Sequence, residues 1–182
     1  MDSSGKHALC KDKDCSLHLH SITSQKFGPV YSSVNAVGII IGVGNVGKYL
    51  SNKPDELNTY LSRDGGLTWT EIKKGSYIYE TGGQDSIIVM PDSQQATDKF
   101  YLSWDEGLTW DSVKFTDIPI EIDDIIIESK ATSQNFIIFG KIWEKGASIA
   151  IDFSSLHQRQ CKGADKPGES NSDYELWREV LG

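Results

Sequence analysis

Two octapeptides of nearly the same sequence lie 41 residues apart in this chain of 182 residues. The first, SRDGGLTW, runs from Ser62 to Trp69, and the second, SWDEGLTW, runs from Ser103 to Trp110 (103 − 62 = 41). Both fit the pattern S-x-D-x-G-x-T-W. A fixed period of this size is typical of a fold assembled from similar supersecondary units, so the repeat constrains the architecture of the chain.

Each octapeptide is flanked by segments that have the composition of β-strands. Residues 58–61 and 99–102 precede the octapeptides, and residues 68–72 and 109–115 follow them. Aromatic and β-branched residues recur in these segments, as they do in strands. The sequence therefore predicts that each octapeptide forms the turn of a β-hairpin.

The residues that recur in the octapeptides suit such a turn. A short Asp side chain can accept hydrogen bonds from turn amides, a Ser hydroxyl can bind another backbone group, and Gly permits a positive φ. We expect the Trp ring to be buried beneath the turn. The predicted structural residues are Ser62, Asp64, Gly66, Trp69, Ser103, Asp105, Gly107 and Trp110. We interpret the two aspartates as structural, and we predict no catalytic residue.

A hairpin that recurs after about 40 residues matches the size of one β-propeller blade. The pattern resembles the Asp-box, a hairpin motif of sialidases, sortilin-type receptors and several other propellers. A propeller closes with roughly four to eight blades, whereas 182 residues at 41 per blade provide at most about four. The predicted fold class is all-β, a partial β-propeller of about three four-stranded blades with Asp-box hairpins, cut from a larger propeller.

Alternation of apolar and polar residues divides the chain into three similar units. The predicted strands are residues 16–22, 38–43, 58–62 and 68–73 in the first unit, 77–81, 86–91, 99–103 and 109–115 in the second, and 124–129, 135–142 and 147–153 in the third. The third unit has no Asp-box and no predicted fourth strand. We expect a polar segment with a cysteine pair at residues 1–15, blades at residues 16–156, and the start of a cysteine-rich module at residues 157–182.

The charge balance disfavours two classes of partner. The chain has 18 basic and 26 acidic residues, which gives a net charge of −8. Nucleic acids and anionic membranes attract basic surfaces, so neither is an expected partner. The first 15 residues lack the apolar core of a signal peptide, and no apolar run is long enough for a membrane helix. We therefore expect no membrane contact by this segment itself.

The run Gly42 to Gly47 matches the dinucleotide-binding pattern G-x-G-x-x-G, and Asp64 follows Gly42 by 22 residues (64 − 42 = 22). That fingerprint needs a helix whose N-terminus faces the pyrophosphate. Here Pro54 interrupts the segment in which the helix would form, and Asp64 already belongs to an Asp-box. We expect no cofactor.

Cys10, Cys15, His18 and His20 form the pattern C-x4-C-x2-H-x-H. Cysteine and histidine are zinc ligands, but this spacing does not match a common zinc module. A disulfide between Cys10 and Cys15 is the favoured alternative, and no metal site is predicted. Cys161 stands alone in the polar tail.

Glu121, Asp123 and Asp124 form an acidic cluster, and a pair of carboxylates can serve glycoside hydrolysis. We interpret the cluster as a solvated loop between blades. A sialidase would also need an arginine cluster for the substrate carboxylate. The arginines are one Asp-box residue and two residues of the tail: Arg63, Arg159 and Arg178.

Beyond the Asp-boxes, the sequence resembles the sortilin family over nearly its whole length. The segments that carry the resemblance are CSLHLHS from Cys15, GIIIGVGNVG from Gly38, NTYLSRDGGLTWTEIKKG from Asn58, YLSWDEGLTW from Tyr101, IDFSSLHQRQC from Ile151 and DYELW from Asp173. The resemblance implies a ten-bladed luminal propeller followed by a cysteine-rich module, a membrane helix and a cytosolic sorting tail. This chain would cover the last three blades and the entry to the cysteine-rich module.

The resemblance implies a non-enzymatic function. It predicts a segment of a luminal receptor that binds protein or peptide cargo, namely vacuolar hydrolase precursors, and carries it from the late Golgi to the endosome and vacuole. The alternatives are an Asp-box glycosidase-like propeller and a non-functional truncated paralogue. The ligand-binding residues are unknown, because no residue matches a ligand-contact motif.

Overall fold

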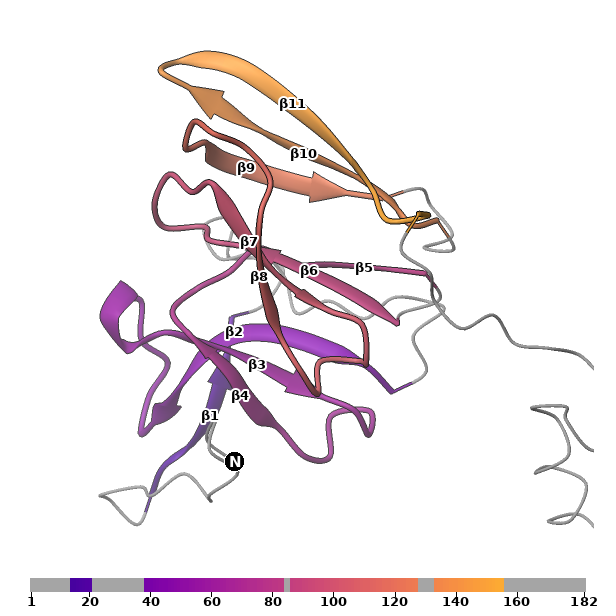
Figure 1. Cartoon of the computed structure of the whole chain (residues 1–182). Helices are drawn as coiled ribbons and strands as arrows, with labels where there is room; N and C mark the ends of the chain where they lie inside the picture. The colour runs from indigo at the N-terminus through magenta and orange to yellow at the C-terminus, as the bar shows by residue number, and fades with distance from the viewer. Residues whose placement is uncertain (1–13, 21–37, 84–85, 128–132, 156–182) are drawn as a thin grey trace, which may run out of the picture.

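The computed structural model describes residues 14–20, 38–83, 86–127 and 133–155 (Figure 1). In this part of the chain the regular structure is almost entirely β. The strands are β1 (Ser16–Leu19), β2 (Ile40–Gly47), β3 (Asn58–Ser62), β4 (Thr70–Lys74), β5 (Glu80–Gly82), β6 (Ile87–Pro91), β7 (Lys99–Ser103), β8 (Asp111–Lys114), β9 (Glu121–Ile126), β10 (Asn135–Ile142) and β11 (Lys145–Asp152). One short 3-10 turn, η1 (Pro54–Glu56), lies between β2 and β3.

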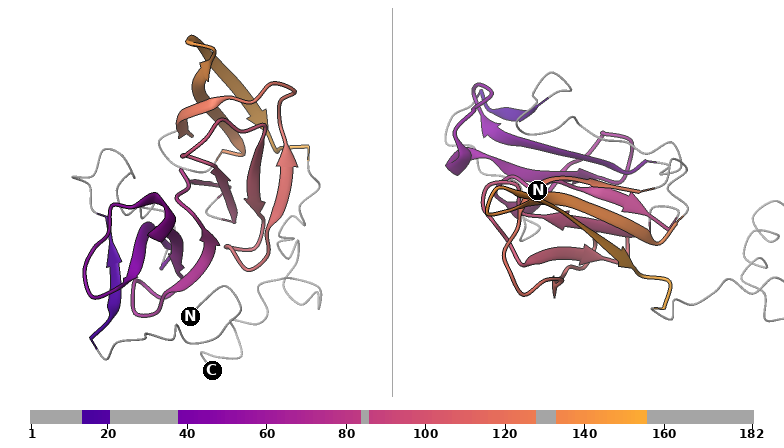
Figure 2. Two further views of the ribbon diagram at one scale, coloured as in Figure 1. Left: turned by 90° about the vertical axis from the view of Figure 1, so that its left-hand side faces the viewer. Right: turned by 90° about the horizontal axis from the view of Figure 1, so that it is seen from above.

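The strands form three antiparallel sheets, each made of strands that follow one another in sequence. The first sheet has the order β1-β2-β3-β4, the second β5-β6-β7-β8 and the third β11-β10-β9. The second sheet lies between the other two, as Figure 1 and the left-hand view of Figure 2 show. The predicted all-β class is confirmed, and the sheets are arranged as consecutive blades would be. Closure of a propeller ring remains a prediction.

Three of the predicted strands agree fully with the observed ones. β3, β7 and β10 have the predicted bounds. Both strands that follow the octapeptides begin two residues later than predicted, because the octapeptide turn reaches Trp69 and Trp110. β2 continues to Gly47, four residues beyond its predicted end, and β9 begins at Glu121 rather than at residue 124.

Strand β6 explains why the second sheet is buried on both faces. Side chains of a strand alternate between the two faces of a sheet. Ile87 and Val89 belong to the hydrophobic cluster shared with the third sheet, whereas Ile88 and Met90 belong to the cluster shared with the first. All four side chains are fully buried. The position of β6 between two apolar layers thus explains its short, continuous apolar run.

An aromatic cluster joins the second and third sheets. The buried ring of Phe153, which follows β11, lies edge-on to the rings of Phe100, Trp104 and Phe136, with centroid distances of 6.1, 5.3 and 5.6 Å. Edge-to-face pairs at such distances add to the stability gained by burial. The third sheet is thus fixed against the second by aromatic packing.

The other face of the third sheet carries exposed apolar side chains. Ile126, Ile137 and Phe139 are each 38 to 39% exposed, and Ile137 pairs directly with Ile126 across the sheet. In the described part of the chain this sheet has three strands, as predicted.

Candidate functional site

The first octapeptide forms a hydrogen-bonded turn around two side chains. The Ser62 hydroxyl donates to Asp64 Oδ1 at 2.8 Å and accepts from the amide of Gly66 at 2.8 Å. Asp64 also accepts from the amide of Thr68 at 2.8 Å and from the Thr68 hydroxyl at 2.6 Å. Each recurring polar residue therefore holds part of the turn.

The second octapeptide repeats this network bond for bond. The Ser103 hydroxyl donates to Asp105 Oδ1 at 2.8 Å and accepts from the Gly107 amide at 2.8 Å. Asp105 accepts from the amide of Thr109 at 2.8 Å and from its hydroxyl at 2.6 Å. This agreement supports the prediction that both aspartates are structural.

The tryptophan rings lie against their turns and are partly buried. A Cβ on Gly66 would lie 3.9 Å from the Trp69 ring, and one on Gly107 would lie 3.3 Å from the Trp110 ring. Each indole N–H donates to a carbonyl of its own turn, Trp69 to Gly66 at 3.0 Å and Trp110 to Gly107 at 3.2 Å. The ring therefore braces the side of the turn, because its N–H must reach a backbone acceptor there.

Backbone conformation explains the glycines of the turns. Gly66 has φ 93° and Gly107 has φ 80°, which are left-handed values that favour glycine. The residue before each glycine is also left-handed, Gly65 with φ 70° and Glu106 with φ 56°. The second turn therefore places a residue with a side chain where the first has glycine.

Hydrogen bonds lower the pKa values of both aspartates. The Thr68 hydroxyl, followed by the Thr68 amide and the Ser62 hydroxyl, lowers the pKa of Asp64 to about 2. At Asp105, burial raises the pKa, but the hydrogen bonds from Thr109 and Ser103 outweigh it and the pKa lies below its ordinary value. Both carboxylates are thus ionised hydrogen-bond acceptors at neutral pH, which suits a turn.

A contact that the sequence did not predict links the two turns. Arg63 Nε donates to the backbone oxygen of Glu106 at 2.9 Å. Burial lowers the pKa of Arg63, although Asp105 and Glu106 favour its charged form. The site is also close-packed, because a Cβ on Gly107 would lie 3.1 Å from a methyl carbon of Leu61. The two Asp-box hairpins are therefore in direct contact.

The G-x-G-x-x-G run lies within a strand. Residues 42–47 belong to β2, which pairs with β1 and β3. A Cβ on Gly44 would collide with the backbone carbonyl of His18, so this glycine permits close approach of two strands. The segment after the strand is a loop that leads into η1, and no α-helix is present in the described part of the chain. The residues do not fit a dinucleotide site.

The two histidines hold backbone groups of the neighbouring segment. His18 Nε2 lies 3.1 Å from the oxygen of Gly47, and His20 Nε2 lies 2.9 Å from the oxygen of Ser51. Among the described residues, no three His, Cys, Asp or Glu side chains are grouped as a metal site. Cys15 is disulfide-bonded, while Cys10 lies outside the described residues, so their pairing remains a prediction.

The acidic cluster lies on a strand and not in a loop, contrary to the interpretation from sequence. Glu121, Asp123 and Asp124 belong to β9, because this segment pairs with β10. Asp123 lies 3.7 Å from the ammonium group of Lys141, and Asp124 accepts a hydrogen bond from the amide of Ile125 at 2.8 Å. These contacts give Asp123 and Asp124 local partners on the third sheet.

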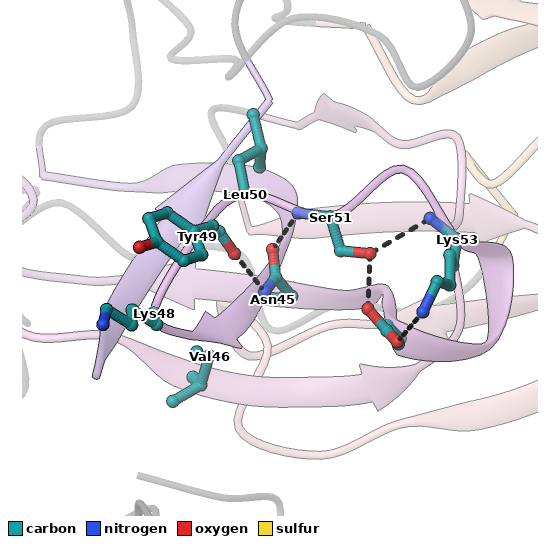
Figure 3. Close-up of a pocket in the computed structure, with 9 residues that line it drawn as sticks. Asn45, Val46, Lys48, Tyr49, Leu50, Ser51 and Lys53 are labelled. Atoms are coloured by element: carbon teal, nitrogen blue, oxygen red, sulfur yellow. Dashed lines mark hydrogen bonds and ion pairs between the residues drawn. The ribbon is translucent and has the colours of Figure 1, made fainter. Parts of the chain in front are cut away.

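Within the described part of the chain, an open pocket lies at the end of the first sheet. It has a volume of about 480 Å³ and is formed by the end of β2, the loop after it and η1 (Figure 3). Its lining residues are Asn45, Val46, Gly47, Lys48, Tyr49, Leu50, Ser51, Lys53 and Glu56. The sequence does not predict this pocket, because the loop conformation depends on contacts between distant residues. The pocket combines apolar, charged and backbone polar groups, as ligand-binding pockets do.

Stacked antiparallel sheets with two equivalent hydrogen-bonded hairpins define an all-β repeat protein. A protein-family model described as "Sortilin, neurotensin receptor 3" matches residues 1–125, and one described as "Sortilin, neurotensin receptor 3, C-terminal" matches residues 127–180. The chain belongs to the sortilin family. The predicted resemblance is confirmed.

Several fungal proteins named "Vacuolar protein sorting/targeting protein 10" are similar to the chain. The Debaryomyces hansenii protein is 42% identical over 181 residues, which covers 97% of this chain and 11% of the relative. The Aspergillus terreus protein is 43% identical over 170 residues, covering 90% of this chain and 11% of the relative. The Emericella nidulans protein is 40% identical over 184 residues, covering 97% of this chain and 13% of the relative. The chain therefore spans 11 to 13% of the length of these relatives.

The two family models meet within a packed region. The first match ends at residue 125, inside β9, and the second begins at residue 127, directly after that strand. Ile122 and Ile125 of this strand belong to the same hydrophobic cluster as Val89 and Phe100 of the second sheet. The junction between the family models is thus continuous in packing, and the domain boundary expected at residues 156 and 157 remains a prediction.

Proposed function

We propose that this chain is a segment of a luminal sorting receptor, which binds precursors of vacuolar hydrolases and carries them from the late Golgi to the endosome and vacuole. The observation that carries the proposal is 42% identity over 97% of the chain to a relative named as a vacuolar protein sorting/targeting protein. Similarity that extends over nearly every sheet and loop supports a shared role for the segment.

The chemistry of the site supports binding rather than catalysis. The most strongly perturbed carboxylate, Asp64, has its oxygens engaged by Thr68 and Ser62 of its own turn. A catalytic carboxylate needs an oxygen directed at a substrate. The acidic cluster on β9 also has local partners, because Asp123 forms an ion pair with Lys141 and Asp124 accepts from a backbone amide. The pocket at the end of the first sheet is the better candidate for contact with cargo.

The location and domain organisation form part of the proposal. Residues 16–156 are proposed to be propeller blades, and residues 157–182 to begin a cysteine-rich module in the lumen of the Golgi and endosome. The disulfide at Cys15 supports an oxidising compartment. The match of residues 127–180 to the C-terminal sortilin model supports a further module. In the part of the chain that the structure describes, no helix has the length and hydrophobicity required to cross a membrane.

A segment exchange tests the proposed function. The 182 residues would replace the matching segment of the Debaryomyces hansenii relative in cells that lack their own copy. Retention of a vacuolar hydrolase inside these cells is the expected result, and secretion of the hydrolase despite normal levels of the chimera would contradict the proposal. A chimera that carries Ser103→Ala and Asp105→Ala, which disrupts the second turn, is the control. It shows the amount of hydrolase secretion that a misfolded segment causes.

A further inference from the structure

The loop after β2 is fixed by buried polar side chains. The side-chain amide of Asn45, which is 7% exposed, donates to the oxygen of Tyr49 at 3.0 Å and accepts from the amide of Ser51 at 2.9 Å. His20, which is 3% exposed, lies 2.9 Å from the oxygen of Ser51. Figure 3 shows Asn45 between the two ends of this loop. Three hydrogen bonds from the buried side chains of Asn45 and His20 therefore restrain the backbone from Tyr49 to Ser51.

Three apolar side chains in and beside this loop are exposed. Tyr49 is 72% exposed, Leu50 is 46% exposed, and Val46 at the end of β2 is 37% exposed. All three line the pocket of about 480 Å³. Apolar groups held in place before binding lose little entropy when a ligand packs on them. A loop of this kind is suited to display an apolar surface.

The two lysines of the pocket differ in their partners. Lys53 Nζ forms an ion pair with Glu56 at 2.8 Å, and Glu56 also accepts from the Ser51 hydroxyl. Lys48 lies at the opposite end of the pocket from Lys53 (Figure 3), with its Nζ 5.6 Å from the centre of the Tyr49 ring. Among the described residues, no carboxylate forms an ion pair with Lys48. One end of the pocket is thus neutralised and the other is cationic.

From these contacts we infer that the pocket binds an extended peptide in which an apolar side chain stands next to a carboxylate. The apolar side chain would pack on Val46, Tyr49 and Leu50, and the carboxylate would pair with Lys48. The volume suits one or two side chains and not a folded domain. This inference rests on the proposed function, because it names the part of a protein cargo that this segment would contact.

Titration of the isotopically labelled chain with blocked tetrapeptides tests the site. The probes are acetyl-Gly-Leu-Glu-Gly-amide, the same peptide with Gln in place of Glu, and the same peptide with Ser in place of Leu. The Leu-Glu peptide should shift the NMR signals of residues 45–51. Each of the other two peptides should bind more weakly, by about two- to five-fold for loss of the carboxylate, since exposed ion pairs contribute modestly.

Three variants link the binding to the named residues. Lys48→Gln should abolish the preference for the Glu peptide over the Gln peptide. Tyr49→Ser should weaken the binding of both of these peptides. Lys145→Gln, which changes an exposed lysine on the third sheet, is the matched control and should change nothing. Equal affinity for all three peptides, or shifts confined to residues outside the pocket, would overturn the inference.

The binding of a whole cargo separates the inference from the proposed function. A purified precursor of a vacuolar hydrolase would be applied to immobilised wild-type, Lys48→Gln and Tyr49→Ser chains. If the precursor binds all three chains equally, the pocket assignment is wrong while the receptor function stands. If the peptides bind as expected but the precursor binds none of the chains, the proposed function of this segment is wrong.

Discussion

Arg63 and Glu106 join two hairpins whose sequences repeat 41 residues apart. The Nε atom of Arg63 donates to the backbone oxygen of Glu106 at 2.9 Å, across the junction between the first and second sheets. Glu106 has φ 56°, so the acceptor belongs to a residue in a left-handed conformation. The bond therefore connects the arginine to the part of the second turn that differs from the first.

Replacement of Arg63 by Ala should weaken the contact between the first two sheets. We expect a loss of about 0.5–1.5 kcal/mol in the free energy of unfolding, the usual range for one hydrogen bond. Urea denaturation followed by tryptophan fluorescence measures this change. Lys99→Ala removes an exposed cation from β7 and is the control. Equal stability of the two variants would show that the bond between the hairpins contributes nothing.

The Ser103→Ala substitution tests the turn network directly. Ser103 is fully buried, and its hydroxyl donates to Asp105 and accepts from the Gly107 amide. Its loss leaves a buried amide without its acceptor, which should cost about 1–3 kcal/mol in thermal or urea unfolding. Ser112→Ala, at an exposed position of β8, should cost less than about 0.5 kcal/mol. A similar cost for both substitutions would remove the evidence for a structural turn.

The low pKa of Asp64 predicts how stability depends on pH. Folding lowers this pKa from an ordinary value of 3.8 to about 2, so the unfolded chain binds more protons between these values. The associated stability is present above pH 4 and is lost as the pH falls toward 2. Thermal unfolding between pH 5 and 2 should show this loss, and Asp64→Asn should reduce the slope. An unchanged slope in the variant would assign the pH dependence to other groups.

Local interactions explain which features were predictable from the sequence. The bonds of Ser62 and Asp64 reach residues no more than four positions away, so the octapeptide alone specifies them. The apolar run of β6 predicts a strand because it is short and rich in branched residues. The tryptophan N–H groups also bond within three positions, to Gly66 and Gly107.

Features that depend on distant partners could not be read from the sequence. Arg63 meets Glu106 across 43 positions, and His20 meets Ser51 across 31. Gly44 belongs to a run that mimics a nucleotide motif, but its role is set by the carbonyl of His18 on the neighbouring strand. The pocket after β2 was missed for the same reason, because Asn45 and His20 determine its shape only after β1 and β2 pair.

The exposed face of the third sheet predicts self-association of the isolated chain. Ile126, Ile137 and Phe139 are each 38 to 39% exposed on one face, and the third sheet has three strands in the described residues. Contiguous apolar surface and a strand edge both favour contact between copies. Light scattering of the 182-residue chain should show a mass that rises with concentration.

Polar substitutions on that face of the third sheet test whether it drives self-association. The double variant Ile137→Thr and Phe139→Ser should lower the association at equal concentration, because it removes apolar area without changing the pairing of β10. Leu67→Ser, which removes an exposed leucine from the first Asp-box turn, should leave association unchanged. If the wild-type chain stays monomeric at every concentration, under reducing and non-reducing conditions alike, the apolar face does not drive association and the prediction is wrong.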